Sequence, residues 1–481
     1  MSKKISSKLR AFGLLLNRIF SSKYFTYAII IIFVLQAIYI LFSVKIGVPP
    51  DELTHIRFIE FYAKQENLSP IISSQTDSFA LGDVTREVSY LYHYLMSLVL
   101  RITELAGLSA YVFLRFAGLA MTVATLFFVI RTAKLLEVPN KVIATSLLVV
   151  TNMAQFLLMS IAINNDNAIW LLTAASIFVL VKLWQSKTGQ LRYLLWLVVL
   201  LVFGVIIKKT FMPLALIFTL TATYYLWQNR NKFKDLFASF KFIEIVMSLI
   251  IIVGIGLVGE RVGINLIKYN KIDAVCDQIH SVENCKNYGV YRRNFELYET
   301  AGTRTREINI LQFKLAWAQK TVARSFGVQA WPGEIETPVV FNLSVIALLT
   351  LALVYGLKNW RSDTATLLIL AVSLYYIVFN MLVNYSLYKR WGVFDLALQG
   401  RYIFPILVPL VIFSTYILWR GLGAQGLTRL RMPLAIVVIS SVIFVSGLQL
   451  FVSDTRFISN PIKPVIIFNS SNAISKYEPG Y

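Results

Sequence analysis

The chain contains a series of apolar segments that are long enough to cross a lipid bilayer. The first of them, residues 26–44, holds nineteen residues without a charge, and about twenty apolar residues in a helix span the hydrocarbon core of a membrane. Short basic stretches separate it from the segments that follow. The pattern predicts an all-α, polytopic membrane protein with about eleven transmembrane helices, at residues 26–44, 110–130, 142–163, 167–183, 193–207, 211–227, 242–258, 339–356, 364–384, 401–419 and 432–451.

The overall composition agrees with this fold class. Of the 481 residues, 57% are hydrophobic and only 15% are charged, which is too apolar for a soluble globular protein. The net charge of +21 would suit nucleic acid, but the basic residues lie between the predicted spans, so we expect no nucleic-acid partner. Cys276 and Cys285 lie in one polar segment. A disulfide between them would require an oxidising compartment, and the sequence leaves that bridge open.

The charges of the connections predict the orientation of the chain in the membrane. With the N-terminus in the cytoplasm, every inner connection is basic, as the positive-inside rule requires. The first apolar run is too long for the core of a cleaved signal peptide, so we expect it to remain as a span. The basic residues of the inner connections are Arg131, Lys134 and Lys141; Lys182, Lys187 and Arg192; Arg230, Lys232, Lys234 and Lys241; Lys358 and Arg361; and Arg420, Arg429 and Arg431.

This orientation divides the chain into four parts. We expect an N-terminal membrane module at 1–258 with a first outer loop at 45–109, a large outer loop at 259–338, C-terminal membrane helices at 339–451, and an outer tail at 452–481. Within the first outer loop, the stretch "EVSYLYHYLMSLVLRITELAG" has an apolar face interrupted by charges. It predicts an amphipathic helix lying in the interface. The alternative is a twelfth span, which would invert every later loop.

The stretch "GVPPDELTHIRFIEFYAK" follows the first span directly and places Asp51, Glu52 and His55 at the membrane surface. One interpretation is a helix start, because proline favours the first turn and acidic side chains offset the positive end of the helix dipole. The other begins from spacing, since Asp51 and His55 lie one helical turn apart. A carboxylate that is partly desolvated there suits a general base.

Other polar residues are expected at the same outer side. Asn165 and Asp166 lie in a turn between two spans, Lys208 and Lys209 end a span, and Arg401 begins one. Lysines at that end oppose the positive-inside trend and favour an anion nearby. Together these residues predict carboxylates and cations at one membrane face, as expected for an anionic, lipid-linked substrate.

The order of these motifs resembles the GT-C superfamily of membrane glycosyltransferases, which take a sugar from a polyprenyl-phosphate carrier. "PPDELTH" occupies the place of the acidic pair after the first span, and "YLYHYLMSLVLRITELAG" that of an interfacial helix. "LRFAGLAM", "AINNDNAIWLL", "IKKTFMP" and "QGRYIFPILVP" follow in the family's order, over about residues 26 to 420. Unlike for better-known members, we expect no large C-terminal outer domain after the last predicted span, and acceptor recognition would then fall to the 259–338 loop.

The resemblance implies an inverting transfer from a polyprenyl-phosphate-sugar donor to a lipid-linked or surface glycan such as O-antigen. It places the active site on the outer face of the bacterial cytoplasmic (inner) membrane. Asp51 would be the base, with Glu52 as the second candidate, and His55 would either orient the carboxylate or contact the phosphate. No cofactor is certain, and a divalent metal is possible although no ligand set is visible. Implied for acceptor binding or support are Asp166, Asn165, Tyr92 and His93, and for the donor phosphate Lys208, Lys209, Arg401 and Tyr402.

Two other classes of function remain open. A transporter or flippase of lipid-linked sugars also needs cations in the membrane, but it predicts inverted repeats, and the sequence shows none. A polysaccharide polymerase or ligase would use arginine and histidine in a late outer loop, where His280, Arg292 and Arg293 are present. The spacing of these three residues does not distinguish a site from a solvated surface.

Overall fold

The computed structural model describes residues 13–65, 69–71, 86–186, 189–230, 241–304, 308–331, 333–358, 364–452, 454 and 456–458. Within these ranges the secondary structure is helical apart from one two-stranded hairpin and one isolated bridge, Val44 to Ile458. The predicted all-α fold is therefore confirmed. The outer tail predicted at 452–481 lies largely outside the described residues.

The described part of the chain contains ten helices that are long and apolar enough to cross a membrane, counted with the short turns that continue some of them. A bent pair of helices makes eleven if the pair is one span, which agrees with the expected number. The ten are α2 (Lys23–Ser43), α5 (Ala110–Leu135), α8 (Asp166–Gln185), α9 (Gln190–Ile207), α10 (Met212–Gln228), α12 (Phe242–Val258), α18 (Val339–Lys358), α19 (Thr364–Trp391), α20 (Phe404–Ala424) and α21 (Arg431–Val445).

The predicted span at 142–163 is not one straight helix. It consists of α6 (Asn140–Thr151) and α7 (Ala154–Ile161), which meet at an angle of 79°. Met153 between them is extended, and the N–H of Ala154 donates to Ser446 Oγ at 2.8 Å. A backbone group freed by a helix break must find such a partner inside a membrane protein.

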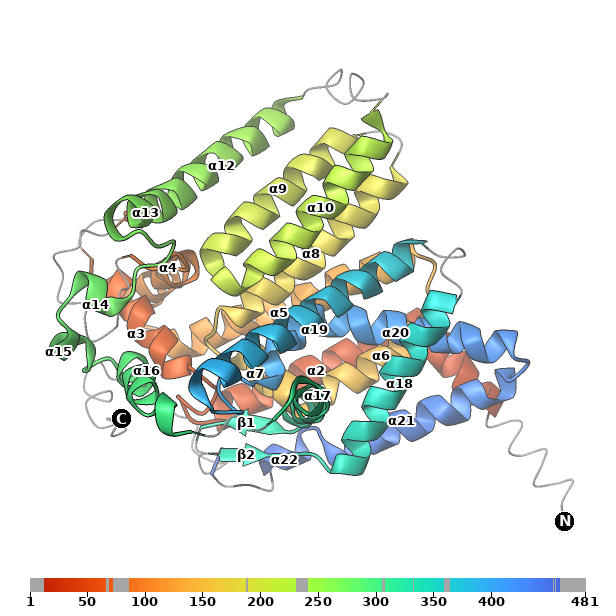
Figure 1. Cartoon of the computed structure of the whole chain (residues 1–481). Coiled ribbons are helices and arrows are strands. Elements are labelled where there is room, and N and C mark those ends of the chain that lie inside the picture. The colour runs from red at the N-terminus through yellow and green to blue at the C-terminus, as the bar shows by residue number, and fades with distance from the viewer. Residues whose placement is uncertain are drawn as a thin grey trace, which may run out of the picture.

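Packing arranges the spans in layers. α8 packs against both α5 and α9, and α9 packs against α12. α20 lies centrally, in contact with α6, α8, α18 and α19. Figure 1 shows short helices gathered at one end of the bundle, whereas α20 and α21 are joined at the opposite end. These short helices are α3 (Glu52–Ala63), α4 (Leu91–Leu105), α14 (Cys276–Ile279), α15 (Val282–Cys285) and α16 (Gly289–Glu299).

Two expectations for the outer loops can be compared with these short helices. α4, which falls in the predicted interfacial segment, has fifteen residues and is not among the candidate spans of the described chain, so the structure does not support a twelfth span there. Cys276 and Cys285 form a disulfide, which answers the question that the sequence leaves open.

A buried ion pair fixes the loop that follows the first span. Arg115 of α5 donates from Nη2 to Glu52 Oε2 at 2.8 Å and from Nε to Oε1 at 3.0 Å. Its Nη1 also donates to the carbonyl oxygens of Leu41 (3.0 Å) and Val44 (2.8 Å), at the C-terminal end of α2. The carbonyl groups at a helix end lack hydrogen-bond donors within the helix. Arg115 donates to them and at the same time neutralises the charge of Glu52.

The Glu52 carboxylate is fully buried and receives two further hydrogen bonds. The N–H of Gly47 donates to Oε2 at 2.8 Å, and the N–H of Ile163 donates to Oε1 at 3.3 Å. Gly47 has φ +87°, a conformation that favours glycine. Glu52 therefore connects α2, the first loop, α5 and the end of α7.

A hairpin links the first loop to the start of α20. It is formed by β1 (Val328–Ala330) and β2 (Gly333–Ile335), and follows α17 (Ile310–Phe326). The N–H of Trp331 donates to Val48 O at 2.9 Å, and Ser325 Oγ donates to Gly400 O at 3.2 Å. The segments before α3 and before α20 are thereby held beside one another.

We expect Arg115→Met to destabilise the folded protein by about 3–5 kcal/mol, because it leaves the Glu52 charge buried without a partner. Thermal unfolding of the purified protein in detergent measures the effect. Arg131→Met is the control, since Arg131 lies on the same helix but is exposed. The double variant Glu52→Gln/Arg115→Met should recover part of the loss, and equal unfolding midpoints for the two single variants would contradict this role.

Candidate functional site

Asp51 occupies the position immediately before α3 in a left-handed backbone conformation, with φ +62° and ψ 4°. Such a conformation is uncommon for residues other than glycine, although aspartate tolerates it better than most. Within the described chain the carboxylate makes no capping hydrogen bond to α3, and 55% of the side chain is exposed. The helix-start interpretation therefore does not account for the direction of the Asp51 side chain.

Arg401 meets this carboxylate from the opposite end of the sequence. It lies in the 3₁₀ turn η7 (Gly400–Ile403) before α20, and its side chain is 1% exposed. Its Nη2 forms an ion pair with Asp51 Oδ2, and its Nη1 donates to Pro50 O at 3.0 Å. The ring of Tyr402 lies 5.6 Å from the guanidinium carbon. Arg401 thus holds both the backbone and the carboxylate of the first loop.

Asp166 and Lys208 extend this row of charges. Arg401 Nη1 lies 3.6 Å from Asp166 Oδ2, and Lys208 Nζ donates to Asp166 Oδ1 at 2.5 Å. Asp166 begins α8, and its N–H donates to Asn164 Oδ1 at 2.9 Å. Asp51, Arg401, Asp166 and Lys208 therefore form a row of alternating charges, which we call the charge row.

Two asparagines hold the turn between α7 and α8 in place. Asn164 Nδ2 donates to Pro50 O at 3.2 Å, so this carbonyl accepts from both Asn164 and Arg401. Asn165 Nδ2 donates to Ile207 O at 3.4 Å, at the end of α9. The predicted support residue Asn165 therefore positions Lys208, which follows Ile207 directly.

The two adjacent lysines point to different partners. Lys208, 16% exposed, joins the charge row, whereas Lys209, 54% exposed, pairs with Asp273 Oδ2 at 2.5 Å. Glu87 lies near Lys209, and burial raises the pKa of its carboxyl to about 7, although Lys209 acts in the opposite direction. The structure thus brings Lys208, but not Lys209, to the charge row.

His55 and His93 form a buried pair behind Asp51. His55 Nδ1 and His93 Nε2 are 2.8 Å apart, and the stacked rings have centroids separated by 5.1 Å. Tyr92 packs edge-on against His55 at 6.1 Å. Burial lowers the pKa of His55 to about 3 against the attraction of Asp51, and burial also lowers the pKa of His93. Both imidazoles are therefore neutral at pH 7, one donating to the other.

The electrostatics of Asp51 are set by its neighbours. Desolvation by the surrounding groups acts to raise its pKa, but Arg401, His55 and Lys208 more than offset it and hold the pKa at about 2. Asp51 is therefore fully ionised at neutral pH.

The sequence analysis leaves open whether the protein binds a divalent metal ion. In the part of the chain that the structure describes, no group of three histidine, cysteine or acidic side chains is placed to hold a metal ion. Asp51 instead pairs with Arg401, and Asp166 pairs with both Arg401 and Lys208. We assign no metal ligand.

Two residues that organise the site, Arg115 and Asn164, are not predicted as site residues from the sequence. Arg115 appears there only as the second residue of the motif "LRFAGLAM", and Asn164 only within the motif "AINNDNAIWLL". A signal for Arg115 was present, because an arginine inside an otherwise apolar span needs a partner within the protein. The identity of that partner, Glu52, depends on the packing of α3 against α5.

No protein-family model matches this chain, and no curated protein matches it. Solved structures are found by similarity of fold. ArnT from Cupriavidus metallidurans, in the apo state, has a TM-score of 0.45 and 13% identity over 82% of this chain and 61% of that one. The archaeal oligosaccharyltransferase AglB from Archaeoglobus fulgidus, in complex with an inhibitory peptide and a dolichol-phosphate, has a TM-score of 0.44 and 12% identity over 88% and 56%.

A second structure of the Archaeoglobus fulgidus oligosaccharyltransferase, tethered to an acceptor peptide, has a TM-score of 0.46 and 11% identity over 89% of this chain. These proteins are GT-C membrane glycosyltransferases, the superfamily that the motifs resemble. The chain spans only 55–61% of their lengths. The likeness is a distant one of overall fold, and the residue roles proposed below come from the geometry of this chain.

The two buried histidines predict a loss of stability in mild acid. They are neutral in the folded state, whereas in the unfolded chain they bind protons below their usual pKa of 6.5, so protons favour unfolding as the pH falls below about 6.5. Each lowers the stability by up to about 1.4 kcal/mol per pH unit. We expect the unfolding midpoint to fall between pH 7 and pH 5, and to fall less in His55→Gln/His93→Gln.

The third histidine supplies the control. His280→Gln replaces the histidine of the large outer loop and leaves the buried pair in place. The buried neutral pair would be refuted if the double variant and His280→Gln lost the same stability between pH 7 and pH 5.

Proposed function

We propose that this protein is a glycosyltransferase that moves a sugar from a polyprenyl-phosphate-linked donor to a hydroxyl group of a lipid-linked or surface glycan. The observation that carries the proposal is the half-exposed Asp51 carboxylate beside the buried Arg401, with the partly buried Lys208 in the same charge row, at one end of a membrane-type helix bundle. The basic inner connections support an outward-facing site in the bacterial cytoplasmic membrane. O-antigen remains one expected acceptor.

The proposed reaction needs a base on one side of the sugar and cations on the other. Asp51 accepts the proton of the acceptor hydroxyl, and the hydroxyl oxygen forms a bond to the anomeric carbon. The bond from that carbon to the phosphate oxygen breaks, and the phosphate leaves with the electron pair, which inverts the configuration. Arg401 and Lys208 stabilise the charge that develops on the phosphate.

The low pKa of Asp51 is compatible with this role only if its environment changes when the donor binds. A carboxylate with a pKa of about 2 is a weak base at neutral pH. A donor phosphate near Arg401 would share the positive charge that now stabilises the Asp51 anion. Its negative charge would also raise the proton affinity of Asp51, so we propose that donor binding activates the base.

Glu52 has a different proposed role. The sequence leaves it as the second candidate for the base, but its carboxylate is fully buried and accepts four hydrogen bonds, two from Arg115 and two from backbone N–H groups. An acceptor hydroxyl has no access to a group enclosed in this way. We propose that Glu52 is a positioning residue for Asp51.

The remaining predicted residues divide between the two substrates. His55, backed by His93 and Tyr92, lies on the α3–α4 side of Asp51, where we propose acceptor binding or support. Tyr402 lies against Arg401 and would border the phosphate. Lys209 pairs with Asp273 of the large outer loop, so we propose that it organises this loop.

A glycan profile of the cell envelope, with and without the protein, separates the three classes of function. A transferase predicts the loss of one sugar decoration. A flippase predicts accumulation of a lipid-linked precursor on the inner leaflet, and a polymerase or ligase predicts a change in chain length or attachment. Either of the last two profiles would overturn the proposal.

We expect Asp51→Asn to reduce sugar transfer by about 10²–10⁴-fold, because the amide cannot accept the proton. The measurement is the envelope glycan profile of cells that express the variant at the normal level. Asp277→Asn, an exposed change in the outer loop, is the control and should transfer normally. Wild-type transfer by Asp51→Asn would exclude Asp51 as the base.

The adjacent lysines provide a matched pair of variants. We expect Lys208→Gln to weaken binding of polyprenyl phosphate, the proposed product, by about 10–100-fold, because a charge-assisted contact is lost. Lys209→Gln removes the same charge one residue away and should change the affinity by less than about threefold. Equal effects of the two changes would remove Lys208 from the phosphate site.

A further inference from the structure

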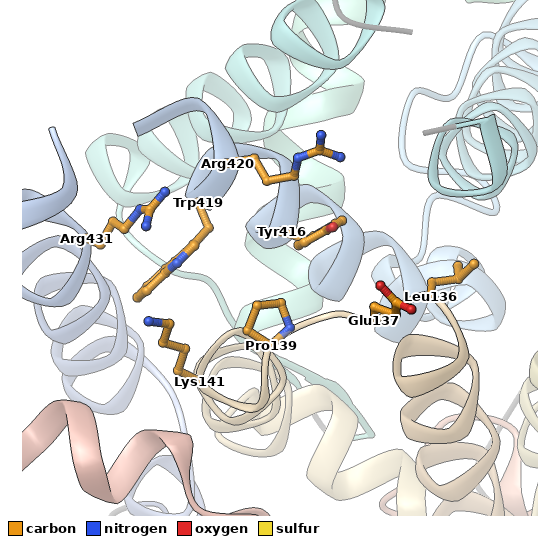
Figure 2. Close-up of a pocket in the computed structure, with 8 residues that line it drawn as sticks. All are labelled: Leu136, Glu137, Pro139, Lys141, Tyr416, Trp419, Arg420 and Arg431. Carbon is orange, nitrogen blue, oxygen red and sulfur yellow. The ribbon is translucent and has the colours of Figure 1, made fainter. Parts of the chain in front are cut away.

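A second polar site lies at the end of the bundle opposite the charge row. It is a cavity of about 620 Å³ between the α5–α6 connection and the α20–α21 connection (Figure 2). Arg401 and Arg420 lie near opposite ends of the α20 segment, so about 28 Å of helix separates them. That length is close to the thickness of the hydrocarbon core of a bilayer. The lining residues are Leu136, Glu137, Pro139, Lys141, Tyr416, Trp419, Arg420 and Arg431.

The centre of this cavity is an indole flanked by two cations. Lys141 Nζ lies 5.2 Å and the Arg431 guanidinium carbon 5.4 Å from the centre of the Trp419 ring. Figure 2 shows both side chains directed toward Trp419 from different helices. Trp419 is buried, with 7% of its surface exposed. Arg420, over Tyr416 at 5.7 Å, adds a third positive charge to the lining.

The lining of the cavity carries more basic than acidic side chains. Glu137 is its only acidic lining residue, against three basic ones. Among the described residues, no carboxylate lies within ion-pair distance of Lys141 or Arg431. Arg431 Nε is buried without a hydrogen-bond partner in the same part of the chain. A buried N–H donor of a cation requires an acceptor, and an anion in the cavity would supply it.

We propose that this cavity binds the phosphate-bearing headgroup of an anionic lipid. A phosphate diester offers acceptor oxygens to Arg431 and Lys141, and pockets of about 300–1,000 Å³ accept groups of this size. Basic pockets between spans at the cytoplasmic surface suit anionic lipids. The aromatic rings lie where tryptophan and tyrosine usually meet the membrane interface. The lipid would belong to the leaflet opposite the proposed transfer site.

The experiment compares lipids with the purified full-length protein in detergent. Binding of phosphatidylglycerol and phosphatidylcholine is measured by native mass spectrometry and by the shift in unfolding midpoint. We expect at least about tenfold tighter binding of the anionic lipid, and about tenfold weaker binding in Lys141→Gln/Arg431→Gln. The matched control is Lys134→Gln/Arg429→Gln, which removes two exposed charges from the same end without touching the cavity.

Three outcomes would overturn the proposal. The first is equal binding of the two lipids by the unmodified protein. The second is an equal loss of phosphatidylglycerol in the two double variants. The third is complete displacement of phosphatidylglycerol by millimolar inorganic phosphate, which would identify a site for free phosphate instead of a lipid. If the glutamine variant does not fold, Lys141→Arg/Arg431→Lys keeps both charges and should retain the lipid preference.

Discussion

The buried ion pair between Glu52 and Arg115 fixes the geometry on which the candidate site depends. A buried carboxylate without a partner would be costly, so Glu52 must lie where Arg115 can reach it, and Arg115 in turn must close the C-terminal end of α2. Because the Glu52 side chain points into the protein, the side chain of Asp51 points in a different direction. Asp51 takes a left-handed backbone conformation and directs its carboxylate toward Arg401. The Glu52–Arg115 pair positions the first loop more than it stabilises the fold, because desolvation of the two charges offsets much of their attraction.

Adjacent residues of like charge are separated by the same reasoning at a second position. Lys208 and Lys209 end α9 together, yet one reaches Asp166 and the other reaches Asp273 in the large outer loop. The extended backbone of Lys208 turns the chain at this point and places the two side chains on different sides. In each pair of adjacent like charges, Asp51–Glu52 and Lys208–Lys209, the first residue belongs to the charge row and the second binds a surrounding element. The ion pairs of Glu52 and Lys209 therefore fix the segments of chain that carry Asp51 and Lys208.

The sequence predicts the spans well and the contacts between them poorly. Hydropathy identifies the spans because a bilayer requires long apolar helices. It does not reveal the break at Met153, because apolar residues continue on both sides and the partner of the freed N–H, Ser446, lies far along the chain. Charge placement predicts acidic and basic residues at one membrane face, and the structure pairs Asp51 with Arg401, and Asp166 with Arg401 and Lys208. It cannot distinguish Asp51 from Glu52 or Lys208 from Lys209, since only packing against α5 and the outer loop decides their directions.

The charge row has a physical consequence for the proposed reaction. Arg401 is almost completely buried, so without an anion its charge would be left uncompensated, and Asp51 and Asp166 provide that compensation in the present structure. A donor phosphate could replace Asp51 as the partner of Arg401 at little electrostatic cost, because one anion takes the place of another. The displaced Asp51 would then lose the interaction that most strongly lowers its pKa. Under the proposed mechanism the base therefore becomes effective only when the phosphate of the donor is present, which ties proton abstraction to a filled donor site.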